Sequence, residues 1–98
     1  MTLNELRHLI EPEWDTLRAR GVTALYVFGS VARDQATAVS DVDILVDYDP
    51  TSDFNLFDLA GVQRRLAARL GANVDVVTRD GVHRRIRERV LQQAVRVM

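Results

Sequence analysis

The run VTALYVF at residues 22–28 most narrows the folds open to this chain, because it is apolar on both of its alternating faces. Such a strand needs cover on both sides, as in a sheet with helices packed over it. Two further short runs, 42–48 and 73–78, are also predicted as strands bounded by turn residues. The sequence therefore predicts an α/β (α+β) fold, with a small mixed sheet of three or four strands and helices packed against it.

Helical spacing of apolar residues lies between and around these runs. Thr2 and Glu5 form a capping box that starts a helix near residue 3, and Pro12 either kinks this helix or makes it stop and restart. Further helices are expected over 53–70 and from 84 to about 95. The faces expected to pack inward are Leu3, Leu6, Ile10, Trp14 and Leu17, then Leu56, Leu59, Val62, Leu66 and Leu70, then Ile86, Val90 and Ala94.

Length and composition set the remaining bounds. The 98 residues are expected to form one domain, residues 1–98, with one core. The chain has no cysteine, which excludes disulfides and thiolate zinc sites. Its first residues do not have the pattern of a signal peptide, and no apolar run is long enough to span a membrane, so we expect a cytoplasmic protein. A net charge of −1 argues against a dedicated binder of duplex nucleic acid, and direct binding of nucleic acid is not expected.

The balanced total charge hides a strong segregation along the chain. Residues 41–58 contain six Asp and no Lys or Arg, which is a local charge of −6. Residues 81–98 contain five Arg and one Glu, which is a local charge of +4. The basic end is expected to face solvent, with contact to an acidic partner or RNA as the alternative. The acidic segment also faces solvent in the simplest interpretation, but it suits a divalent cation as well.

Three features at strand ends carry the candidate chemistry. Gly29-Ser30 ends the first strand, where glycine permits close approach of the backbone and free amides of a following helix can hold a phosphate. Asp41 and Asp43 are two residues apart on the second predicted strand, so they point to the same side with their Cα atoms roughly 6.5–7 Å apart. Mg²⁺ would relieve the repulsion between their carboxylates. Asp75 lies in an otherwise apolar strand, where an acid needs a partner.

Each of these features has a purely structural alternative. Gly-Ser pairs are usually plain turns, two acids at the start of a strand can simply be solvated, and Asp75 can lie on an edge strand with one wet face. If the strands of Asp43 and Asp75 are neighbours, however, the carboxylates converge as metal-dependent phosphoryl transfer requires. The third acid could then also accept the proton of the nucleophile.

The combined pattern G-S-x10-D-x-D resembles the signature of the polymerase-beta-like nucleotidyltransferases. The likeness runs from about residue 22 to 78, and the flanking helices fit it as well. The short chain, with its segments GSVAR, SDVDILVDY, FDLAGVQRRLAARLG, NVDVVT and IRERVLQQAV, is similar to the minimal nucleotidyltransferases (MNT). Members of that group are single-domain antitoxins found beside HEPN-domain ribonuclease toxins.

The resemblance assigns a role to each matching position. It implies that Gly29 and Ser30 seat the nucleotide phosphates and that Arg33 reaches the outer phosphates. It further implies that Asp41, Asp43 and Asp75 are catalytic and hold Mg²⁺, with two ions expected. One departure is Asp34, which stands where many relatives have glycine and puts nucleotide affinity in doubt.

The expected function follows from this resemblance. The chain would transfer AMP from ATP to a hydroxyl, expected to be a tyrosine, of a cognate HEPN toxin and so silence it. One alternative is a non-catalytic antitoxin, whose acidic segment 41–58 blocks a basic ribonuclease groove. Another is a small-molecule nucleotidyltransferase, which would need a separate helical subunit because 98 residues leave no room for a second domain.

Overall fold

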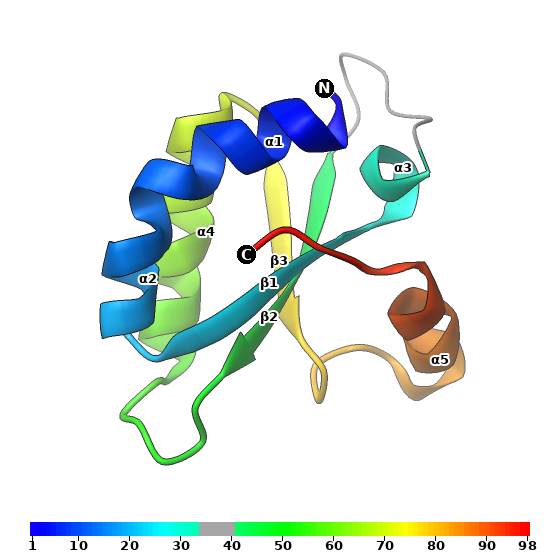
Figure 1. The fold of residues 1–98 in the computed structure, drawn as a ribbon. Coiled ribbons are helices and arrows are strands. Elements are labelled where there is room, and N and C mark those ends of the chain that lie inside the picture. The colour runs from blue at the N-terminus through cyan, green and yellow to red at the C-terminus, as the bar shows by residue number, and fades with distance from the viewer. Residues whose placement is uncertain (34–40) are drawn as a thin grey trace.

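A computed structural model describes residues 1–33 and 41–98 (Figure 1). Its mixed sheet has four strands in the order β3-β2-β1-β4, so the predicted mixed fold is confirmed. Asp34, the departure from the family pattern, lies outside the described residues. The elements in chain order are α1 (Leu3–Ile10), a 3-10 turn η1 (Glu11–Glu13), α2 (Trp14–Ala19), β1 (Val22–Phe28), α3 (Gly29–Ala32), β2 (Val42–Tyr48), α4 (Leu56–Leu70), β3 (Val74–Thr78), α5 (Arg84–Gln93) and β4 (Val95–Arg96).

The first helical segment stops and restarts at its proline. Thr2 caps α1 by accepting a hydrogen bond from the backbone N–H of Glu5 at 3.1 Å, as the capping box predicts. Pro12 lies at the start of η1, where a missing N–H costs nothing, and α2 follows directly. Within the described parts of the chain, no helix is long and apolar enough to cross a membrane.

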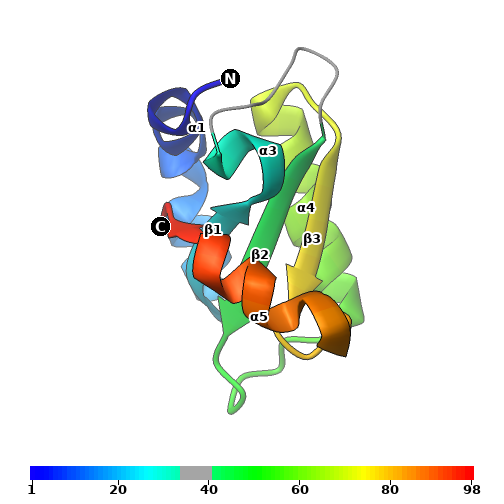
Figure 2. The same ribbon diagram turned by 90° about the vertical axis from the view of Figure 1, so that its right-hand side faces the viewer.

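Strand β2 lies between β1, with which it pairs antiparallel, and β3, with which it pairs parallel. Helices α1, α2 and α4 cover one face, and α3 and α5 lie on the other (Figures 1 and 2). The larger core fills the first face, while a smaller cluster around Leu45, Val82 and Val90 lies under α5. Figure 2 shows that α5 crosses the lower part of the second face and leaves the starts of β2 and β3 uncovered.

Two sequence predictions about α4 were wrong at its start. The helix begins at Leu56 rather than at residue 53, because Asn55 accepts hydrogen bonds from the N–H groups of Phe57 and Asp58 while Asp58 accepts one from Asn55. Leu56 was predicted to pack inward, but it is 81% exposed. A reciprocal cap therefore sets the helix boundary more strongly than apolar spacing does.

The C-terminal segment also differs from the prediction. Helix α5 ends at Gln93, because Ala94 takes an extended conformation. Residues 95–96 then form β4, which pairs with β1 and lies at the edge of the sheet. Val90 faces inward as expected, but Ile86 was wrongly placed on the same buried side and is 48% exposed.

Candidate active site

Asp43 is the residue around which the predicted site assembles. It lies opposite Phe28 on β1 and opposite Asp75 on β3. Neighbouring strands are about 4.8 Å apart, and residues in register on parallel strands share a face of the sheet. Asp41 immediately precedes β2, and its negative charge acts on Asp43. The fold thus brings the three predicted carboxylates to one end of the sheet, beside α3 (Figure 2).

Gly29 brings the backbone directly against this group of acids. Its φ of +72° lies in the left-handed region, and a Cβ added there would collide with Oδ2 of Asp43. Only glycine meets both conditions without strain. Ser30 follows in the first turn of α3, and both residues are partly buried. The predicted phosphate turn and the predicted acids are therefore in contact through Gly29 and Asp43.

The electrostatics of the site centre on the same carboxylate. Burial raises the pKa of Asp43 above its usual 3.8, and the negative charges of Asp75 and Asp41 raise it further. The positive charge of Arg33 acts in the opposite direction. A carboxylate crowded by two others disfavours its own ionised form unless a cation compensates it. The site therefore has an unbalanced negative charge that a divalent cation would relieve.

The donor set fits magnesium, since three carboxylates supply the hard oxygen ligands that Mg²⁺ prefers while leaving room for water and phosphate oxygens. Within residues 1–33 and 41–98, no three His, Asp or Glu side chains already converge as a ready cluster of metal ligands. Asp41, Asp43 and Asp75 therefore stay predicted ligands, supported by strand register and by the charge coupling at Asp43.

Arg33 connects the site to α5. Its Nη1 donates a hydrogen bond to Oε1 of Gln93 at 3.3 Å, and it lies close enough to influence Asp43. Nothing in the sequence pattern indicated Gln93, because the contact joins residues 60 positions apart. Gln93 is thus a partner of a predicted site residue that the sequence did not indicate.

Asp47 shares the face of Asp43 by alternation but has a structural partner at the far end of β2. Arg79 donates to both of its carboxylate oxygens, at 2.7 and 3.0 Å. The Arg79 guanidinium also lies 5.4 Å from the ring centroid of Tyr26. This paired acid is therefore separate from the candidate site.

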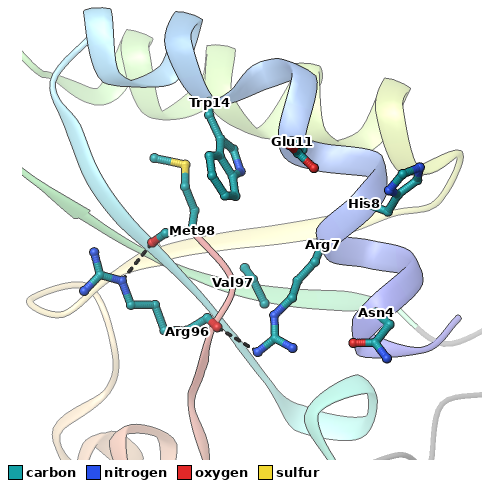
Figure 3. Close-up of a pocket in the computed structure, with 8 residues that line it drawn as sticks. All are labelled: Asn4, Arg7, His8, Glu11, Trp14, Arg96, Val97 and Met98. Atoms are coloured by element: carbon teal, nitrogen blue, oxygen red, sulfur yellow. Dashed lines mark hydrogen bonds between the residues drawn. The ribbon is translucent and has the colours of Figure 1, made fainter.

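A hollow of about 560 Å³ lies apart from the acids, between α1 and the C-terminal residues (Figure 3). Arg7 donates to the carbonyl oxygen of Arg96 at 3.1 Å, and Nε of Arg96 donates to a backbone oxygen of Met98 at 2.9 Å. The indole N–H of Trp14 is buried there without a hydrogen-bond partner. None of the predicted site residues lines this hollow, so its size does not make it the catalytic centre.

Comparison with known proteins decides the family. The sequence model of one protein family, the nucleotidyltransferase domain, matches residues 10–97 of this chain. The chain belongs to this family. Nucleotidyl transfer is accordingly its class of activity, and the predicted strand-end motif lies within the matched range.

Two relatives match over nearly the whole of both chains. Protein adenylyltransferase MntA of Thermococcus cleftensis is 36% identical over 98 residues, which cover 99% of this chain and 97% of the relative. A candidate protein adenylyltransferase of Methanocaldococcus jannaschii is also 36% identical over 98 residues, covering all of both chains. The similarity to these relatives therefore covers nearly the whole chain and is not confined to the motif G-S-x10-D-x-D.

Solved structures agree with this assignment. A structure described as a candidate minimal nucleotidyltransferase superposes with a TM-score of 0.80 at 37% identity, covering 97% of this chain and 95% of that chain. A complex of the tri-AMPylated HEPN toxin of Shewanella oneidensis with its MNT antitoxin superposes with a TM-score of 0.62 at 21% identity, covering 94% and 71%. The second likeness is one of fold.

Proposed function

We propose that this nucleotidyltransferase transfers AMP from ATP to a hydroxyl group of a HEPN-domain ribonuclease toxin and thereby neutralises it. The observation that carries the proposal is the contact of Gly29 with a carboxylate, Asp43, that is charge-coupled to Asp75 and Asp41. The proximity of a turn suited to phosphate and of acids suited to magnesium supports this proposal. The name of the Thermococcus cleftensis relative and the AMPylated toxin in the Shewanella complex support the choice of acceptor.

Each residue has a role in this transfer. Asp41, Asp43 and Asp75 would hold Mg²⁺, and two ions are expected; when bound, the metal supplies charge neutralisation at the phosphates. Gly29 leaves space for the triphosphate beside the Asp43 carboxylate, and the hydroxyl of Ser30 is a hydrogen-bond donor for its oxygens. Arg33 adds the positive charge that an outer phosphate requires.

The reaction is a substitution at the α-phosphorus of ATP. The acceptor oxygen, which we propose to be that of a tyrosine, forms a bond to this phosphorus while the bond to the bridging oxygen of the β-phosphate breaks. Pyrophosphate leaves, and the acceptor proton passes to a carboxylate, for which Asp75 is the proposed base. Asp75 is exposed and in register with Asp43, so it borders the space that the acceptor must enter.

A transfer assay tests the proposal. The chain is incubated with the HEPN toxin, Mg²⁺ and ATP labelled at the α-phosphate, and label on the toxin is measured. The double variant Asp41→Asn/Asp43→Asn should lose at least about 100-fold in rate, since the metal contribution is several kcal/mol. Asp47→Asn is the matched control, because this acid lies on the same strand and face but is paired with Arg79. Undiminished labelling by the double variant would reject the proposal.

Direct occlusion of the toxin is the second candidate, and the charge of −6 over residues 41–58 favours it. Complementary charge would mainly speed association with a basic ribonuclease groove. Under this mechanism, the double variant should still neutralise the toxin in cells whenever the complex forms. A double variant that binds the toxin but leaves it active would exclude occlusion and retain transfer.

A further inference from the structure

Two adjacent apolar side chains at the start of α4 project into solvent. Leu56 is 81% and Phe57 is 88% exposed. The other exposed large apolar side chains of the described residues are between 36% and 48% exposed. Single exposed apolar residues are ordinary on protein surfaces, but two neighbours held almost fully in water indicate a surface that a partner covers.

A hollow of about 200 Å³ lies beside these side chains. Its lining residues come from the end of β2, the following loop, the start of α4 and the end of β3: Tyr48, Phe54, Asn55, Leu56, Leu59 and Thr78. The surface, which we call the α4 patch, therefore combines two projecting apolar groups, Leu56 and Phe57, with this small recess. Such a combination suits insertion of complementary side chains from another protein.

The α4 patch is held in a fixed conformation. The reciprocal cap between Asn55 and Asp58 fixes the backbone from which Leu56 and Phe57 project. Behind them, the rings of Tyr48 and Phe54 stack with their centroids 4.9 Å apart. A surface that is already ordered loses little conformational entropy on binding, and this favours recognition of a partner.

The charges around the patch indicate the chemistry of that partner. Asp49, Asp53 and Asp58 flank the patch in the sequence, within a segment that has no Lys or Arg from residue 41 to 58. Of these three acids, only Asp58 forms an ion pair among the described residues; its carboxylate lies 3.9 Å from the guanidinium of Arg20. Exposed apolar side chains next to the exposed carboxylate of Asp53 are complementary to an apolar surface that carries arginine or lysine.

We propose that the α4 patch docks the basic surface of the ribonuclease toxin, away from the reacting atoms. A ribonuclease must contact the phosphates of RNA and so needs a basic surface. The patch adjoins Tyr48, which is five residues after Asp43 on β2 and so roughly 17 Å from it. The toxin thus makes two separate contacts: a docking contact at the α4 patch and the entry of its acceptor hydroxyl at the acids. This inference rests on the proposed function for the identity of the partner.

The test separates docking from chemistry. The double variant Leu56→Ser/Phe57→Ser is compared with Ile86→Ser, which removes a 48% exposed apolar side chain from α5 and serves as the matched control. Kd for the HEPN toxin of the transfer assay is measured by calorimetry. The double variant should raise Kd at least about tenfold, and the control should leave it unchanged. In the transfer assay, KM for the toxin should rise while kcat stays the same, since no reacting group has changed.

A charge variant provides an independent measurement. Asp53→Lys reverses an exposed charge beside the patch and should slow association with the toxin, with a smaller effect at high salt. This variant keeps the proposal testable if the serine variant loses its circular dichroism spectrum.

The outcomes distinguish this inference from the proposed function. Unchanged Kd in both the serine variant and the lysine variant overturns docking at the α4 patch. A wild-type dimer that the serine variant dissociates, with unchanged toxin affinity, assigns the patch to a second copy of this chain and also overturns it. If toxin binding depends on the patch but no label is transferred by the wild type, the docking surface stands and the proposed transfer fails.

Discussion

Replacing Gly29 with alanine tests the contact on which the candidate site depends. A non-glycine residue at its φ of +72° costs roughly 1–2 kcal/mol. For a domain of this size, each 1 kcal/mol lowers Tm by roughly 4–8 °C. The added Cβ would also fall well inside van der Waals contact of the Asp43 carboxylate, so this carboxylate must move. A shift of about 1 Å in a reacting geometry can cost about 100-fold in rate.

Gly71→Ala is the matched control for the backbone cost. Gly71 ends α4 with a φ of +62°, and a Cβ added there would meet no atom within 4 Å. The two variants should therefore both lower Tm by several degrees. Only Gly29→Ala should also lose about 100-fold in AMP transfer, because only this variant displaces a predicted metal ligand.

Thermal unfolding and label transfer from ATP are measured on both variants at a temperature where both remain folded. A Gly29→Ala variant that is destabilised as expected but transfers AMP at the wild-type rate would refute the role given to this contact. Equal loss of transfer in Gly71→Ala would refute it as well, since the loss would then follow from general destabilisation.

Three further variants test the electrostatics and the caps. Asp43→Asn should raise the free energy of unfolding at neutral pH by less than about 1 kcal/mol, because it removes a crowded charge that solvent partly screens. Since the raised pKa of Asp43 means that the folded state binds its proton more tightly, this gain should shrink as the pH falls through the raised pKa and should be absent well below 3.8, where both states are protonated; urea titrations showing a constant gain would contradict the charge coupling. Asn55→Ala should cost about 1 kcal/mol in urea unfolding and increase amide exchange in the first turn of α4, and wild-type protection there would argue against the cap. Arg79→Met should cost less than about 1 kcal/mol, and raising the salt concentration should reduce the difference, because its pair with Asp47 is partly exposed; a loss that salt does not alter would indicate a packing role instead.

The strands were the most predictable part of this fold. β1 and β2 have the predicted bounds, because each is a short apolar run closed by residues that favour turns. The two residues of β4 were not predictable, since they are too few for a period of two to appear. They form a strand because β1 offers an unpaired edge, which is a property of the assembled sheet.

Part of the candidate site could be predicted from local sequence patterns, and part depends on which strands become neighbours. The spacing of Gly29, Asp41 and Asp43 is local, and the motif was visible in the sequence. The pairing of Asp43 with Asp75 depends on the order of the strands, which local patterns do not contain; the family resemblance implied it, and the parallel pairing of β2 with β3 confirms that the two acids are in register. The exposed start of α4 was missed because apolar spacing predicts burial without showing what lies opposite.

Along β2, residues of the core alternate with a predicted residue of the site, so the register of this strand determines both packing and chemistry. Asp43 faces the open side of the sheet, while its neighbours Val42 and Ile44 belong to the larger core. A slip of one residue would exchange these faces and bury the carboxylate among aliphatic groups. A chain with β2 mispaired would thus lose both its core packing and the predicted group of carboxylates, so the hydrophobic cost of misalignment also preserves the candidate site. Single-residue insertions inside β2 should accordingly be far less tolerated than substitutions on the surfaces of the helices.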